Sequence, residues 1–201
     1  MLSESRIRLA LRALRLGLPG VEIYYAVKAN PHPAILRIVR EEGGRFDVCT
    51  AGEIALVQQA GATGADCIHT HPVKRNSDIC QALDFGIDTF VADNEWELQK
   101  LVPYRDRVKV LLRLSVQNPH CVVNLSHKFG VAPRDAMALL HAAREHDVRV
   151  EGLAFHIGSQ NENVLKYVEA LDYCRDICRM AALEGTTLHT IDIGGGFPID
   201  Y

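Results

Sequence analysis

The 201-residue sequence lacks a strong excess of charge of either sign, with 22 lysines and arginines against 25 aspartates and glutamates and a net charge of −3. Proteins that bind nucleic acid or an anionic membrane rely on a basic field, which this balance does not supply. The sequence also has no apolar run near the roughly 20 residues of a membrane-spanning helix, and no signal-peptide core. We therefore expect neither a nucleic-acid partner nor a membrane partner.

The spacings of metal sites and of a disulfide framework are missing as well. The nine histidines show no helical H-x-x-x-H or H-E-x-x-H pattern, so no metal site is predicted. The six cysteines form no C-x-x-C pair, and Cys174 and Cys178 are one helical turn apart, as on a helix face. Reduced thiols of this kind are typical of a cytoplasmic protein.

What the sequence does have is a regular alternation of strand-like and helix-like segments. Predicted strands lie at 21–28, 45–49, 66–70, 89–92, 108–115, 150–157 and 188–193, and predicted helices at 1–18, 34–42, 50–60, 75–85, 94–101, 134–146 and 162–184. This alternation indicates an α/β fold with a parallel sheet. With 48% hydrophobic residues, the chain can bury its core as a single domain over residues 1–201.

Polar residues or glycines lie near the ends of five of these strands or directly after them, at Lys28, Asp47, Arg113, His156 and residues 194–196. A doubly wound sheet places its ligand at one switch point, whereas a TIM barrel gathers residues from many strand ends at one face. The distribution therefore favours a (β/α)8 TIM barrel. Because a closed barrel needs eight strands and only seven are predicted, we expect an incomplete barrel whose open edges promote association.

Lys28 stands where the first predicted strand ends, and lysine is rarely buried unless it is paired. It is either a solvated lysine or a desolvated amine with a lowered pKa, the state needed to attack a carbonyl and hold a Schiff base. Asp47, after the second strand, is a candidate partner for this amine. Glu53 has the spacing of a capping box with Thr50, which is its more ordinary role.

The later strands end in residues that suit an anion. Gly194, Gly195 and Gly196 form a candidate phosphate cradle, because glycine lets backbone N–H groups approach an anion closely. His156 is either a core histidine bonded to a backbone carbonyl or, with Ser159 beside it, part of a binding rim. Arg113 stays charged within an apolar strand, so it needs a carboxylate, a phosphate or another acid of the barrel.

Four motifs in this sequence occur in the same order as in one enzyme family. They are Tyr25–Asn30 (YAVKAN), Leu125–Gly130 (LSHKFG), Phe155–Gln160 (FHIGSQ) and Asp192–Pro198 (DIGGGFP). Together they resemble the fold-type III pyridoxal-phosphate decarboxylases, which act on ornithine, lysine, arginine or diaminopimelate. The resemblance extends from residue 21 to residue 198 and implies the N-terminal, alanine racemase-like barrel of that family.

The resemblance also implies roles for single residues. Lys28 would hold pyridoxal phosphate as a Schiff base, and His156 would stack on the pyridine ring, which makes these two the catalytic residues. The cofactor-binding residues would be Lys28, Asp47, Arg113, His156, Ser159, Gly194, Gly195 and Gly196. Lys128 would lie at the contact of a homodimer.

The implied function is the decarboxylation of a basic amino acid in polyamine or diamine biosynthesis. Leu125–Gly130 and Gly194–Pro198 lean toward the ornithine/lysine type. Family members carry an eighth strand and a C-terminal β domain with substrate-side groups, so we expect the chain as given to be inactive by itself. It is either a truncated barrel portion or a shortened relative whose open edge is covered by something else. The alternative is a non-catalytic homologue that binds a protein, like the antizyme inhibitors, although Lys28 is retained. One-domain pyridoxal-phosphate carriers resemble a different motif set.

Overall fold

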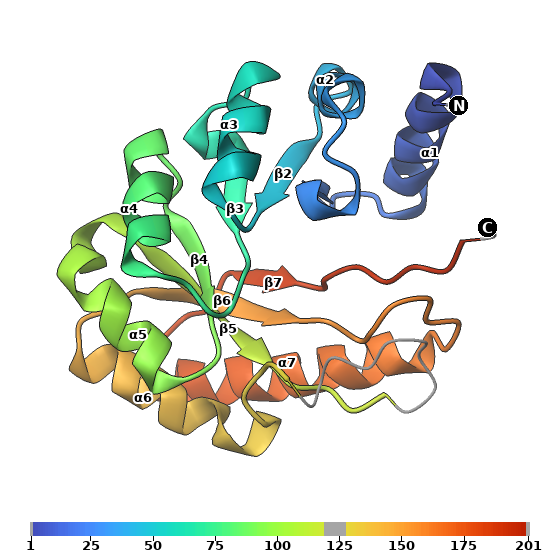
Figure 1. The fold of residues 1–201 in the computed structure, drawn as a ribbon. Coiled ribbons are helices and arrows are strands. Elements are labelled where there is room, and N and C mark those ends of the chain that lie inside the picture. The colour runs from blue at the N-terminus through green and yellow to red at the C-terminus, as the bar shows by residue number, and fades with distance from the viewer. Residues whose placement is uncertain (1, 119–127, 200–201) are drawn as a thin grey trace. The chain divides into compact units, whose positions relative to one another are not determined.

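The computed structural model describes residues 2–118 and 128–199. Within these residues, seven β-strands alternate with seven α-helices in the predicted order (Figure 1). The chain divides into two compact units, Met1–Thr89 and Phe90–Tyr201, which are described in turn.

The first unit builds three strands between helices. Helix α1 (Glu4–Gly17) precedes β1 (Tyr24–Ala26), and α2 (Pro33–Glu41), β2 (Arg45–Val48), α3 (Ala51–Gln59), β3 (Cys67–His69) and α4 (Asn76–Phe85) follow. The strands are parallel, and Asp47 of β2 lies opposite both Ala26 of β1 and Ile68 of β3. Figure 1 shows the helices of this unit side by side in chain order.

Strand β2 shows how this sheet separates its apolar side chains from its polar ones. Phe46 and Val48 are completely buried, whereas Arg45 and Asp47, which alternate with them, are half-buried. The apolar face packs against helices such as α3, where Val57 is also completely buried. The opposite face is left to polar residues, and these include the predicted site residue Asp47.

Helix α1 differs from the prediction, which gave it one buried face. None of its residues is buried, and Ile7, Leu11 and Leu14 are half-buried. Ion pairs contribute to its contact with α2: Glu42 accepts hydrogen bonds from Arg8 at 2.9 Å and from Arg12 at 2.8 Å. A short helix that buries little apolar surface depends on such tertiary contacts for its position.

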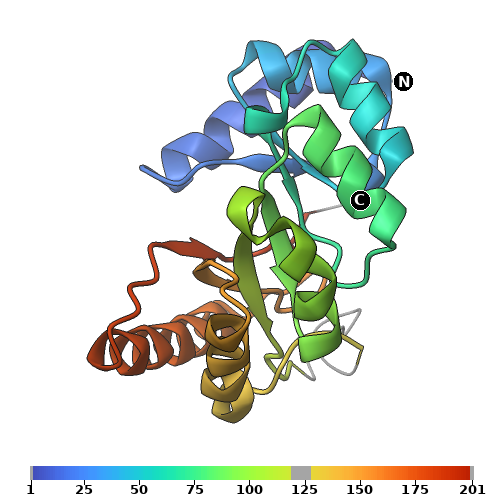
Figure 2. The same ribbon diagram turned by 90° about the vertical axis from the view of Figure 1, so that its left-hand side faces the viewer.

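The second unit repeats the alternation. Its elements are β4 (Thr89–Ala92) at the boundary, α5 (Glu95–Leu101), β5 (Lys109–Leu114), α6 (Ala136–Glu145), β6 (Val150–Phe155), α7 (Leu165–Leu183) and β7 (Thr190–Asp192). β6 pairs in parallel with both β5 and β7. A Cβ atom on Gly152 would lie 1.9 Å from the Thr190 carbonyl oxygen, so glycine permits the close approach of β7. Helices α6 and α7 pack side by side (Figure 2).

The strands follow one another in chain order from β1 to β7. Among the described residues the sheet has seven strands, so β1 and β7 are its edges. Ile191 of β7 is 41% exposed, as expected for an open edge. The predicted association through these edges stays a prediction.

The first strand is shorter than predicted. It ends at Ala26, and Val27–Ala29 form a turn of 3-10 helix, so Lys28 lies in this turn and not at a strand end. The Tyr25 hydroxyl closes the turn by donating to the Asn30 carbonyl oxygen at 3.1 Å. The apolar alternation continues through Val27, so the sequence pattern did not reveal that the strand ends at Ala26.

Two further predictions concern segments of the chain. Over the ranges 2–118 and 128–199, no helix combines the length and the apolar character needed to cross a membrane. The long loop predicted at 116–132 and the motif at 125–130 fall partly on residues 119–127, which lie outside the described residues, as does Cys121.

Candidate functional site

The turn after β1 places the amine of Lys28 at the surface of the first unit. The side chain is exposed, which corresponds to the first of the two alternatives, a solvated lysine after the first strand. Its Nζ lies 3.9 Å from Sγ of Cys49, the residue that follows β2. The amine is therefore accessible to a small molecule while it rests against a thiol.

For Asp47, the structure gives a hydrogen bond to Thr70. Its Oδ1 accepts a hydrogen bond from the Thr70 hydroxyl at 2.5 Å, and Lys28 contacts Cys49. Asp47 and Thr70 come from neighbouring strand segments of the first unit, because Asp47 pairs with Ile68. Thr70 and Cys49 were not predicted, since a threonine or a cysteine near a strand end carries no distinctive pattern.

The thiol of Cys49 is kept neutral by its surroundings. Burial raises its pKa to about 11, and the nearby carboxylate of Asp47 acts in the same direction, whereas Lys28 opposes them. Glu53 also raises this pKa; its carboxylate accepts the Cys49 backbone N–H at 2.5 Å. The Thr50 hydroxyl accepts the Glu53 N–H at 3.2 Å, so only one half of the predicted capping box forms.

In the second unit, the loop after β7 lies directly against the loop after β6. Gly194 and Gly196 have φ angles of +66° and +91°, which favour glycine. A Cβ atom on Gly194 would lie 2.4 Å from the Phe155 carbonyl oxygen, and one on Gly196 would lie 1.9 Å from that of Gly158. A Cβ atom on Gly195 would meet no atom within 4 Å, so this turn of the loop faces open space.

His156 and Ser159 follow β6 on the neighbouring loop. Nδ1 of His156 accepts the Gly158 N–H at 2.9 Å, which places the ring proton on Nε2 of a neutral imidazole. A core histidine was expected to hydrogen-bond to a backbone carbonyl. Nδ1 of His156 instead accepts a hydrogen bond from a backbone N–H. The Ser159 hydroxyl is half-buried and makes no hydrogen bond to any described residue.

Arg113 of β5 is half-buried, as its place in an apolar strand suggested. Its guanidinium carbon lies 5.3 Å from the centre of the Phe129 ring, a cation–π arrangement. Phe129 belongs to the motif at 125–130 and was not predicted as a site residue. Arg113 thus has an aromatic neighbour that the sequence pattern did not reveal.

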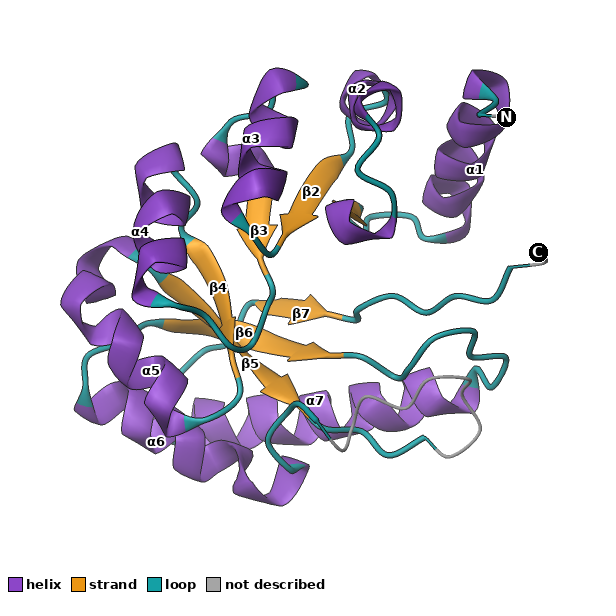
Figure 3. Cartoon of the chain, viewed as in Figure 1, coloured by secondary structure: helices purple, strands orange, loops and turns teal. Residues whose placement is uncertain are grey.

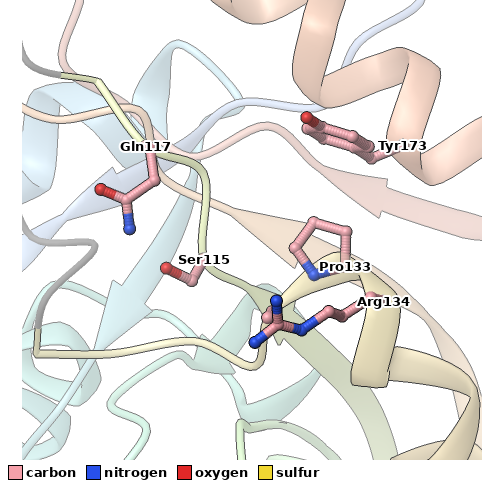
Figure 4. Close-up of a pocket in the computed structure, with 6 residues that line it drawn as sticks. Ser115, Gln117, Pro133, Arg134 and Tyr173 are labelled. Atoms are coloured by element: carbon pink, nitrogen blue, oxygen red, sulfur yellow. The ribbon is translucent and has the colours of Figure 1, made fainter.

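The second unit also contains an open cavity of about 410 Å³ (Figure 4). It is lined by Ser115, Gln117, Ala132, Pro133, Arg134 and Tyr173. None of the predicted site residues contributes to it, so the cavity and the candidate site are different places.

Metal chemistry was not predicted for this chain. Within the described part of the chain, no three histidine, cysteine, aspartate or glutamate side chains are grouped as a metal ion would require.

Comparison with known proteins identifies the family. The family model described as "Pyridoxal-dependent decarboxylase, pyridoxal binding domain" matches residues 4–201. The lysine/ornithine decarboxylase of Selenomonas ruminantium is 36% identical over 186 residues, which are 92% of this chain and 47% of that protein. Human antizyme inhibitor 2 is 35% identical over 181 residues, or 90% of this chain and 39% of that protein.

Solved structures agree with the sequence matches. The lysine/ornithine decarboxylase of Vibrio vulnificus, crystallised with putrescine, superimposes with a TM-score of 0.92 and 43% identity. The match covers 98% of this chain and 52% of that one, so the chain spans about half the length of the proteins it matches. The predicted fold class, an incomplete (β/α) barrel, is confirmed.

Proposed function

This chain belongs to the pyridoxal-dependent decarboxylase family, whose cofactor is pyridoxal phosphate, and we propose that it serves the decarboxylation of a basic amino acid of the ornithine or lysine type. The relatives named above support this substrate class. When bound, the cofactor supplies an electron-accepting ring for the pair released with carbon dioxide. Cytoplasmic polyamine or diamine biosynthesis is the setting that we propose.

The observation that carries the proposal is the exposed amine of Lys28 beside a neutral thiol. An amine that holds the cofactor covalently must be reachable by the cofactor's aldehyde. We assign Lys28 as the covalent attachment residue and Asp47, which like Lys28 acts on the Cys49 thiol, as a nearby acid.

In the second unit, the predicted site residues suit a phosphate group and an aromatic ring. Gly195 faces open space between two glycines that press against the neighbouring loop, and the Ser159 hydroxyl is available within the described structure. Together they would receive the phosphate. The neutral His156 ring would stack on the pyridine ring, and Arg113 would add positive charge on the cofactor's side.

We propose that residues 1–201 act as the cofactor-binding barrel portion and that two copies form a homodimer. Support comes from the exposed edge strand β7 and from the length of the relatives, of which this chain spans about half. We expect the isolated 201 residues to release carbon dioxide from ornithine or lysine no faster than free pyridoxal phosphate does.

A non-catalytic, protein-binding role is the second candidate. It is favoured by the 35% identity to human antizyme inhibitor 2 over 90% of the chain, close to the value for the Selenomonas enzyme. Retention of Lys28 and of the glycine loop supports the first candidate, because a protein that only binds a partner need not keep them.

Borohydride trapping tests the attachment residue. Incubation of the chain with pyridoxal phosphate should give visible absorption, and reduction should leave an adduct on the peptide that contains Lys28. Lys28→Arg should abolish the adduct, whereas the matched Lys166→Arg variant, altered at a lysine paired with Glu169, should keep it. An adduct at another lysine in the folded wild-type chain would refute the assignment.

A further inference from the structure

The loops after β6 and β7 are joined by a side chain at the end of the Phe155–Gln160 motif, to which the sequence analysis assigned no role. Gln160 donates from Nε2 to the Ile199 carbonyl oxygen at 2.9 Å, and its Oε1 accepts the Ile199 N–H at 2.9 Å. One amide group thereby satisfies both backbone groups of a residue 39 positions away. Figure 3 shows the two loops leaving the ends of β6 and β7.

Gln160 holds an unfavourable backbone conformation to do this. Its φ is +53°, in the left-handed region that residues other than glycine rarely adopt. Strain of this kind persists where surrounding contacts over-determine it, and such positions gather at binding sites. Here the two hydrogen bonds to Ile199 offset the strain.

Hydrogen bonds of two buried asparagines accompany this contact. The backbone N–H of Asn161 donates to the Gly196 carbonyl oxygen at 2.9 Å. The side-chain oxygen of Asn161 accepts from Asn118 Nδ2 at 2.9 Å, and the same amide of Asn118 donates to the Ile157 carbonyl oxygen at 2.7 Å. Asn118 and Asn161 are 0% and 3% exposed, so their hydrogen bonds are shielded from water.

We propose that Gln160 is a positioning residue that clamps the glycine loop onto the His156–Ser159 loop and so preforms the cradle for the cofactor's phosphate. Backbone donors bind an anion well only when their geometry is set beforehand, because ordering them on binding costs affinity. The Gly196 backbone touches Gly158, and Gln160 holds Ile199 in the segment that follows, so the two loops are held together at two points. This inference rests on the proposed function, which places the phosphate at these loops.

The Gln160→Gly variant removes the clamp while keeping the stability of the fold. Glycine adopts a φ of +53° without strain, so the substitution removes the two hydrogen bonds and relieves the backbone at once. The matched control is Asp147→Gly. Asp147 has a φ of +54°, is exposed, and lies before β6, at the opposite end of that strand from Gln160.

Titration of the full chain with pyridoxal phosphate and with pyridoxal measures the share of affinity that the phosphate contributes. We expect Gln160→Gly to lower the preference for pyridoxal phosphate over pyridoxal about tenfold, because the unclamped loop must then be ordered when the phosphate binds. Pyridoxal affinity and the thermal unfolding midpoint should stay near the wild-type values. Asp147→Gly should leave the preference unchanged.

The two possible failures are distinguishable. If the wild-type chain prefers pyridoxal phosphate and Gln160→Gly keeps that preference in full, the clamp is refuted and the proposed phosphate site stands. If the wild-type chain binds both compounds equally, the phosphate site of the proposed function is refuted, and the clamp with it.

Discussion

The two groups of candidate residues are held in contrasting ways. In the first unit, Lys28 lies on an exposed single turn and its amine lies 3.9 Å from the Cys49 sulfur. In the second unit, Gly194 and Gly196 are pressed against a neighbouring backbone that Gln160 and a buried pair of asparagines hold in place. The contrast fits the chemistry, because covalent attachment needs an accessible amine, whereas anion binding needs preorganised backbone groups.

Gly196→Ala should have the largest effect. The new Cβ would lie 1.9 Å from the Gly158 carbonyl oxygen at a φ of +91°, so the two loops must separate. Strain and loss of these contacts should cost about 3 kcal/mol or more, measured by urea unfolding. Gly195→Ala is the control, because its Cβ meets no atom, and it should leave stability within about 1 kcal/mol of wild type while weakening pyridoxal-phosphate binding. Equal stability losses in Gly196→Ala and Gly195→Ala would contradict the conclusion that only Gly196 is packed too closely for a side chain.

The thiol beside Lys28 should react slowly. With its pKa raised from 9.0 to about 11, Cys49 should be alkylated by iodoacetamide about 100-fold more slowly at pH 8 in the folded chain than in urea, read by peptide mapping. The rate should keep rising about tenfold per pH unit beyond pH 9, because the reactive thiolate is still a small fraction.

Asp47→Asn should accelerate this alkylation, because removal of the carboxylate removes one cause of the raised pKa. Asp66→Asn, at a carboxylate that bonds Thr63 instead, is the control. If the alkylation rate of Cys49 levels off near pH 9, the pKa of the thiol next to Lys28 is not raised.

The smallest effect is expected at the contact of α1 with α2, where acid should remove the stability contributed by the Glu42 ion pairs. Hydrogen bonds from Arg12 and then Arg8 lower the pKa of Glu42 from 4.5 to about 2. A carboxylate whose pKa is lower in the folded state adds stability that is fully present above pH 4.5 and is lost as the pH falls toward 2. The wild-type chain should therefore unfold at a higher temperature than Glu42→Gln at pH 6, and this difference should disappear between pH 4.5 and pH 2. A difference that persists at pH 2 would mean that the ion pairs do not hold this helix.

Local signals predicted much of what was found. Period-two and helical patterns are properties of short segments, so the order of seven strands and seven helices in the described residues could be predicted within a few residues of each boundary. The error at β1 arose because Val27 continues the apolar alternation, and the 3-10 turn depends on a hydrogen bond from the Tyr25 side chain.

The sequence by itself determined the alternating α/β plan, the family motifs, and the glycines at 194 and 196, whose conformation no other residue adopts as easily. Only the tertiary structure decided that Lys28 meets Cys49, 21 residues away, and that Gln160 clamps Ile199. The physical reason is that such contacts join residues from different β/α segments. The energy of such a contact depends on where the fold places the two groups, and this placement cannot be read from periodicity or local propensity.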